Sequence, residues 1–257
     1  MEEEMKIIRF EKDGEIKFGI LQGEKIKVVS GDIFSDYQIT EQVINLNAVK
    51  LLSPCPITKA VCIGLNYRGH AQEMQLALPD RPLIFLKPSS ALNHPAGEIE
   101  YPGISDDLHY EAELAVVLKK QAKNVKAEDA AAYILGYTCA NDVTARDIQK
   151  ADGQWTRGKS FDTFLPLGPC IETDIDPGSI NIKLYLNNEL KQSSNTNDLI
   201  FKVPQLIEFV SHMMTLYPGD VILTGTPPGV GPMAVGDVVT VELEGIGRLS
   251  NIVVKSI

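Results

Sequence analysis

HYEAELAVVL, residues 109–118, places two glutamates one residue apart at the start of a run that otherwise has the composition of a buried strand. Side chains at positions i and i+2 of a strand project to the same face, so Glu111 and Glu113 are expected to point together. Two carboxylates this close in a poorly solvated place repel each other by roughly several kcal/mol. The stretch therefore predicts a strand that needs a neutralising group: a divalent cation, a lysine or arginine, or solvent at a sheet edge.

A third carboxylate favours the cation. Asp142 follows the apolar stretch YILGYTCA, where the end of a strand would deliver a functional side chain. Three carboxylates form a hard oxygen set that suits Mg²⁺ or Mn²⁺ rather than zinc. The alternative is that Asp142 caps a helix that begins near Val143.

A histidine and a glutamate stand three residues apart in NYRGHAQEM, residues 66–74. On a helix His70 and Glu73 would share a face, and Glu73 could orient the imidazole so that it takes a proton from water. The alternative is a surface histidine beside a solvated glutamate.

Three further segments supply polar side chains of interest. TARDIQ places Arg146 and Gln149 on one face of a helix, WTRGKSFD supplies Lys159, and TGTPPGVG supplies Thr226 in a loop whose N–H groups could face an anion. In the alternative reading, Arg146 pairs with a surface acid, Lys159 is solvated and the Pro-Pro loop is a rigid turn.

Composition limits the class of protein. The 257 residues carry a formal charge of −10, which argues against nucleic acid and anionic membrane surfaces as partners. The four cysteines lack disulfide-like or zinc-like spacing. The acidic N-terminus does not resemble a signal peptide, and no apolar stretch reaches membrane-spanning length. We therefore expect a cytoplasmic protein.

The order of short segments predicts a strand-dominated α+β fold. Residues 1–52 alternate in short strand-like pieces with a turn at Asp13-Gly14, and we expect a small β module there, joined to a main domain of residues 53–257. Asn187-Asn188 marks a second hairpin turn. Helical spacing is predicted over residues 66–79, 127–133 and 203–217.

Taken together, these segments resemble the fumarylacetoacetate hydrolase superfamily. GLNYRGHAQEM, PLIFLKPSSAL, LHYEAELAVVL, NDVTARDIQ, WTRGKSFDTFLPLGP and LTGTPPGVGPMAVGDVVTVELEGIG are similar to its successive signatures, in the same order. The resemblance covers roughly residues 55–255. It implies a mixed, rolled β-structure that assembles as a homodimer.

The resemblance also implies roles for the candidate residues. Glu111, Glu113 and Asp142 would be ligands of Mg²⁺ or Mn²⁺. The catalytic residues would be His70, Glu73 and Lys159, with His70 and Glu73 on a lid helix, and the substrate-binding residues would be Arg146, Gln149 and Thr226. By this resemblance, the long branch of the family has a further aspartate ligand where this chain has Asn66, so the short branch is implied.

The function expected from this resemblance is metal-dependent cleavage of a C–C bond in a small 2-oxo acid. It would proceed by acylpyruvate hydrolysis, by oxaloacetate decarboxylation, or by both. One alternative is an isomerase or decarboxylase of unsaturated dicarboxylic acids from aromatic catabolism. A remote alternative is a protein that binds a metal or an oxo acid without turnover.

Overall fold

The computed structural model describes residues 5–256, so the acidic residues 1–4 that entered the argument against a signal peptide lie outside the described part. Its largest sheet has twelve strands. In spatial order they are β4 (Tyr37–Asn45), β3 (Lys25–Gly31), β2 (Glu15–Gln22), β1 (Lys6–Lys12), β14 (Leu165–Glu172), β12 (Ile134–Asn141), β11 (Ala112–Leu118), β17 (Val221–Leu223), β6 (Lys59–Gly64) and β7 (Leu83–Pro88), with β5 (Lys50–Leu52) paired to β1 and β8 (Leu92–Asn93) paired to β14.

Two smaller sheets complete the β-structure. The five-stranded sheet consists of β16 (Glu189–Asn195), β15 (Asn181–Leu186), β19 (Val238–Leu243), β20 (Gly247–Lys255) and β9 (Glu98–Tyr101). The three-stranded sheet consists of β13 (Thr144–Ala145), β10 (Leu108–Tyr110) and β18 (Gly231–Pro232). Most neighbours are antiparallel, but β17 is parallel to β6 and β20 is parallel to β9. The fold is mixed and strand-dominated, as the sequence predicts.

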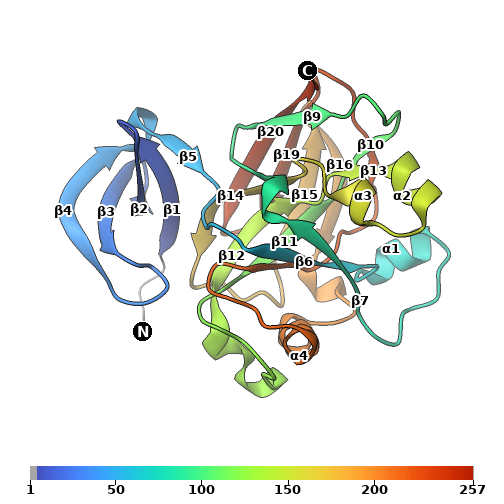
Figure 1. Cartoon of the computed structure of the whole chain (residues 1–257), viewed down its shortest axis with the longest axis horizontal. Helices are drawn as coiled ribbons and strands as arrows, with labels where there is room; N and C mark the ends of the chain where they lie inside the picture. The colour runs from blue at the N-terminus through green and yellow to red at the C-terminus, as the bar shows by residue number, and fades with distance from the viewer. Residues whose placement is uncertain (1–4, 257) are drawn as a thin grey trace.

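Helices are short and few. The α-helices are α1 (Arg68–Glu73), α2 (Arg146–Asp152), α3 (Thr156–Lys159) and α4 (Val203–Met213). The 3-10 helices are η1 (Leu46–Ala48), η2 (Ser89–Ala91), η3 (Ala127–Tyr133) and η4 (Thr196–Asp198). Figure 1 shows α1, α2 and α3 at the end of the molecule opposite to strands β1 to β4. This end carries the candidate site described below.

Both turn predictions are confirmed. Asp13 and Gly14 connect β1 to β2, and Asn187 and Asn188 connect β15 to β16. Each of the four residues has a positive φ, between 52° and 80°. Asp, Asn and Gly tolerate this conformation best, which is why the two dipeptides predicted the hairpins.

The N-terminal strands are continuous with the main sheet. Strand β1 pairs with β14 through Ile7 and Ile171, and side chains such as Phe10 and Ile26 lie in the same apolar cluster as strands β11 and β12. Figure 1 shows β1 to β4 as a distinct lobe at one end of the molecule. The division of the chain at residue 52 stays a prediction.

All three predicted helices differ in the structure. The helix expected over residues 203–217 is α4, which ends at Met213. The helix expected over residues 66–79 ends at Glu73, because Gln75 takes a positive φ of 54° and reverses the chain. Leu76 and Leu78 are then 54% and 53% exposed, so their apolar spacing does not mark a buried helical face. The alanine-rich segment 127–133 forms the 3-10 helix η3 rather than an α-helix. Within residues 5–256, no helix is both long and apolar enough to cross a bilayer.

A buried aspartate ties the central strands together. The carboxylate of Asp220, just before β17, is fully buried and accepts bonds from the backbone N–H and hydroxyl of Thr58 at 3.0 and 2.6 Å. It also accepts from Lys59, through its N–H and Nζ, and from the Tyr217 N–H. Burial alone would raise the pKa of Asp220, but the bonds from Lys59 and Thr58 outweigh burial and lower it.

We expect Asp220→Asn to lower the free energy of unfolding by about 2–3 kcal/mol at pH 7, because the ion pair with Lys59 is lost. A depressed carboxylate pKa stabilises the fold above the pKa of the unfolded chain, near pH 4. The difference between variant and wild type should therefore shrink as the pH falls below about 4. Urea denaturation across this range measures it, with the exposed Asp129→Asn as a control that should change little.

Candidate active site

The three acidic side chains converge. One carboxylate oxygen each from Glu111, Glu113 and Asp142 lies within 4.8 Å of the others, and all three residues are buried. The reason is strand register: β11 and β12 are antiparallel neighbours with Ala112 opposite Asn141, so Glu111 just before β11 and Asp142 just after β12 reach the same edge. Asp142 donates its N–H to the Glu111 carbonyl at 2.9 Å, which fixes the two backbones together.

A close-packed loop after β17 holds the third carboxylate. The Gly225 N–H donates to Glu113 Oε2 at 2.6 Å. A side chain at Gly225 would collide with Asn66, because a Cβ there would lie 2.8 Å from the Asn66 Cβ. Asn66 itself is fully buried and donates to the carbonyls of Thr224 and Phe201. It therefore joins two loops and does not line the cavity described below.

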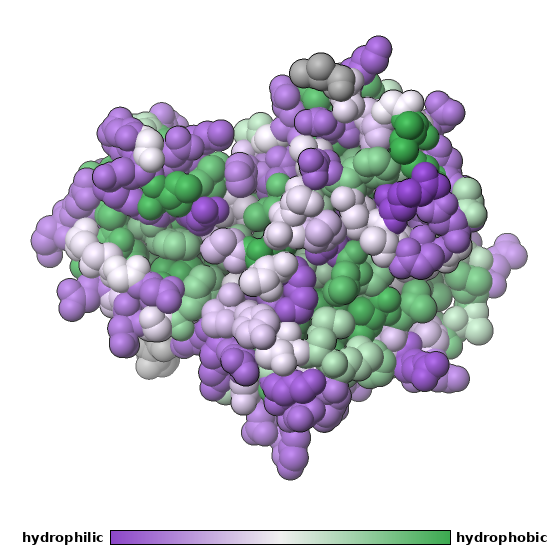
Figure 2. Space-filling view, in the orientation of Figure 1, coloured by the Kyte–Doolittle hydropathy of each residue, from purple (hydrophilic) through white to green (hydrophobic). Residues whose placement is uncertain are grey.

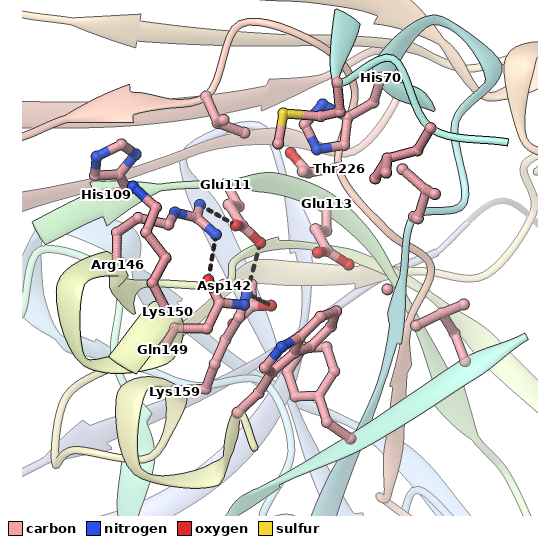
Figure 3. A pocket seen from close by; sticks show the side chains of 18 residues that line it. His70, His109, Glu111, Glu113, Asp142, Arg146, Gln149, Lys150, Lys159 and Thr226 are labelled. Atoms are coloured by element: carbon pink, nitrogen blue, oxygen red, sulfur yellow. Dashed lines mark hydrogen bonds and ion pairs between the residues drawn. The ribbon is translucent and has the colours of Figure 1, made fainter. Parts of the chain in front are cut away.

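Three cations meet the acidic cluster. Lys159 Nζ, at the end of α3, lies 2.8 Å from Glu111 Oε2 and 2.7 Å from Asp142 Oδ2. Arg146 Nη2 lies 2.5 Å from Glu111 Oε1, and the buried Lys87 Nζ lies 2.8 Å from Asp142 Oδ1. Figure 3 shows Lys159 and Arg146 reaching Glu111 from one side while Glu113 stands apart from them.

The pKa values of Glu111 and Glu113 shift in opposite directions. Burial would raise the pKa of Glu111, but the charges of Lys159 and Arg146 outweigh it and hold that pKa far below its usual range. Burial and the charges of Asp142 and Glu111 raise the pKa of Glu113 well above normal. Among the described ion pairs, none involves Glu113. The lysine bridge considered as an alternative neutraliser thus exists for two carboxylates and not for the third.

The donor set fits a hard divalent cation. All the converging ligand atoms are carboxylate oxygens, the type that Mg²⁺ and Mn²⁺ prefer. Glu113 has no cationic partner of its own, and Asp142 Oδ1 is buried without accepting a hydrogen bond. The alternative that Asp142 caps a helix does not hold, since α2 begins at Arg146 and its N-cap is Ala145.

A histidine–glutamate pair lies beside the acidic cluster. His70 Nδ1, on α1, is 2.9 Å from Glu73 Oε2, and Glu73 Oε1 accepts the Gly229 N–H at 3.0 Å. The glutamate is thereby held on both sides and orients the imidazole. In Figure 3 His70 and Thr226 lie above Glu113, whereas Arg146 lies on the far side of Glu111.

The candidate residues line one cavity of about 430 Å³. Eight of the nine residues singled out from sequence line it; Glu73 contacts it only through His70. Leu65, Met74, Leu76, Phe85 and Trp155 supply apolar wall. Figure 2 shows that apolar residues also gather on the outer surface over β7, where Leu83 and Leu86 are exposed.

Sequence reasoning missed two buried polar residues of the site. Lys87 is a buried position of β7. Gln192, on β16, donates to Thr226 Oγ1 at 2.9 Å and accepts the Ala112 N–H at 2.9 Å. A signal was present for the first: Phe85 and Lys87 share one face of the strand FLKP, so a lysine occupies a position that alternation assigns to the core. The second had no local signal.

Comparisons with known proteins agree with this geometry. Residues 59–254 match the family model described as fumarylacetoacetate (FAA) hydrolase C-terminal, and residues 5–54 match the model described as Rv2993c-like, N-terminal. A curated relative, the mitochondrial oxaloacetate tautomerase Fahd2a of Rattus norvegicus, is 46% identical over an alignment of 213 residues. The alignment covers 77% of this chain and 68% of that protein.

Solved structures are similar over nearly the whole chain. A 2-hydroxyhepta-2,4-diene-1,7-dioate isomerase from Mycobacterium marinum is 40% identical with a TM-score of 0.92, covering 98% of this chain and 99% of that one. A maleylpyruvate hydrolase from Sphingobium sp. SYK-6, solved with manganese(II) and pyruvate, is 29% identical with a TM-score of 0.84, covering 98% and 100%.

The unpaired position of Glu113 generates a prediction. Glu113→Gln should weaken Mn²⁺ binding at least about 100-fold, because a charged ligand is lost. The same variant should raise the unfolding temperature of the metal-free protein by roughly 2–4 °C. Burial and the neighbouring carboxylates raise the pKa of Glu113, so keeping this group in the fold costs free energy that a neutral glutamine does not.

Titration calorimetry with Mn²⁺ and thermal unfolding in EDTA measure the two effects. Glu24→Gln, at an exposed turn, is the matched control and should leave both unchanged. Retained Mn²⁺ affinity in Glu113→Gln would remove Glu113 from the ligand set.

Proposed function

The chain belongs to the fumarylacetoacetate hydrolase family, and on that premise we propose that it is a divalent-cation-dependent enzyme that enolises a small 2-oxo dicarboxylic acid. The observation that carries the proposal is the convergence of Glu111, Glu113 and Asp142 in a cavity that also contains His70, held by Glu73. One side of this arrangement can hold a cation, and the other can move a proton.

Glu111, Glu113 and Asp142 would hold Mg²⁺ or Mn²⁺. When bound there, the cation supplies Lewis acidity that polarises a 2-oxo group and favours its enolate. The manganese in the maleylpyruvate hydrolase structure supports this assignment.

The protein's own residues then position the substrate and move its proton. Lys159 and Thr226 would donate to the carboxylate oxygens at the 2-oxo end, while Arg146 and Gln149 would steady the distal oxygens. His70 Nδ1 is engaged by Glu73, so the other ring nitrogen is left to exchange a proton with C3 of the substrate.

The charges at the site favour a dianionic substrate. Six ionisable side chains meet there: Glu111, Glu113, Asp142, Lys87, Lys159 and Arg146. With a divalent cation bound and Glu113 ionised, the three negative and three positive charges of these six side chains cancel. The cation then leaves an excess of two positive charges within the cluster. A substrate with two carboxylates balances that excess, and buried charge without balance is costly.

We propose proton transfer as the main reaction, in place of the C–C bond cleavage expected from the sequence. The relatives named as oxaloacetate tautomerases and the isomerase structure favour it. Decarboxylation and acylpyruvate hydrolysis stay as second candidates, because both pass through the same enolate and a hydrolase is among the similar structures.

We further propose that the chain works as a homodimer in the cytoplasm. The exposed Leu83 and Leu86 on the edge strand β7 support an apolar contact between two copies. Light scattering coupled to gel filtration tests the stoichiometry.

An assay of four reactions on three substrates tests the proposal. Enol-to-keto conversion of oxaloacetate, followed by the ultraviolet absorbance of the enol, should be fastest and should require Mg²⁺ or Mn²⁺. Pyruvate release from oxaloacetate, hydrolysis of acetylpyruvate, and isomerisation of 2-hydroxyhepta-2,4-diene-1,7-dioate are measured beside it. Undiminished turnover in EDTA would refute the cation-dependent mechanism, and hydrolysis as the fastest reaction would restore the sequence-based expectation.

The histidine gives a sharper test of mechanism. His70→Asn should slow tautomerisation and acetylpyruvate hydrolysis at least about 100-fold, since both need a base. Decarboxylation of oxaloacetate should fall less than about 10-fold, because loss of CO₂ requires no proton removal. His212→Asn, at an exposed position of α4, is the control. Equal losses in all three reactions would exclude His70 as the base.

A further inference from the structure

One lysine of the site is fully enclosed in protein. Lys87 has no exposed surface, although it lies on β7 among apolar neighbours. Its Nζ donates to the carbonyls of Val143 at 3.0 Å, Lys159 at 2.6 Å and Phe164 at 2.8 Å. An ammonium group has three protons, so these three bonds use all of them.

We propose that Lys87 is a positioning residue of the cation site, acting through Asp142 and Lys159. The inference rests on the proposed function, because it assumes that Asp142 is a cation ligand. Lys87 lies outside the residues that line the cavity, so it contacts neither substrate nor bound ion.

The three carbonyls belong to two parts of the chain, one directly after β12 and one running from the end of α3 to β14. Val143 directly follows the ligand Asp142, Lys159 ends α3, and Phe164 directly precedes β14. Bonds from one nitrogen therefore fix the backbone beside the ligand relative to the backbone of the substrate-binding lysine. Side chains at a cation site need this kind of support to hold their geometry.

The contact with Asp142 is electrostatic. Lys87 Nζ lies 2.8 Å from Asp142 Oδ1, yet Oδ1 accepts no hydrogen bond, because the ammonium protons point to the carbonyls. The charge of Lys87 stabilises the buried carboxylate without a hydrogen bond to Oδ1, whereas Oδ2 accepts one from Lys159. An apolar side chain at position 87 would leave Asp142 buried with Lys159 as its single cation.

The neighbouring strand offers a matched control. Lys59 on β6 also forms an ion pair with a buried carboxylate, that of Asp220. The Lys59 side chain is 21% exposed. Neither Lys59 nor Asp220 lines the cavity. Replacing Lys59 thus removes a lysine–aspartate pair from the same sheet without touching the candidate site.

The test is Mn²⁺ affinity, measured by electron paramagnetic resonance of free Mn²⁺, in wild type, Lys87→Met and Lys59→Met. Removal of groups that orient cation ligands typically weakens binding about 10–100-fold, and we expect this of Lys87→Met. Both variants should lower the unfolding temperature, but Lys59→Met should bind Mn²⁺ as wild type does. A Lys87→Met protein with wild-type or tighter affinity would overturn the proposal.

Two further measurements keep the test decisive. Lys87→Gln retains two protons for the carbonyls and provides a folded variant if Lys87→Met does not fold; the same loss of affinity is expected. The wild-type protein is titrated with Mn²⁺ in the same series. If the wild-type protein binds no Mn²⁺ at all, the proposed function fails rather than the role of Lys87 alone.

Discussion

The structure depends on the balance between three buried carboxylates and three cations at one edge of the main sheet. Such a cluster is expensive in isolation, since each charge loses its hydration on burial. It is tolerated because most of its members are paired within 2.8 Å. Glu113 is the exception: it accepts the Gly225 N–H but has no cationic side chain paired with it among the described residues, so the cluster favours one more positive charge.

The arrangement of strands makes that cluster possible. Antiparallel pairing of β11 and β12 brings residues thirty positions apart to the same edge, and the loop after β17 closes over them. Gln192 and Lys87 connect this edge to the five-stranded sheet and to the segment around α3. The rigid part of the site is therefore built on strands, whereas His70 lies on a six-residue helix followed by an exposed segment. The cation ligands thus lie on the main sheet, and the candidate base lies on a short helix beside it.

The main fold features were predictable because they are encoded locally. The branched, apolar composition of EAELAVVL, together with the turn residues Asp13-Gly14 and Asn187-Asn188, indicated strands and hairpins that the structure contains. The helix over residues 66–79 was predicted too long, since apolar spacing cannot tell a core-facing side chain from one that faces a cavity. Leu76 lines the cavity and is more than half exposed.

The sequence by itself determined that Glu111 and Glu113 share a face, that Asp142 ends a strand, and that His70 and Glu73 meet one helical turn apart, because each relation depends on backbone periodicity over a few residues. Only the tertiary structure decided that Lys159 bridges Glu111 and Asp142 and that Glu113 has no cationic partner in the described part of the chain. It also decided that the buried Lys87 lies next to Asp142 and donates to the Lys159 carbonyl. Those relations join segments tens of residues apart. Which charge pairs with which is set by sheet register and loop packing, and no local pattern carries that information.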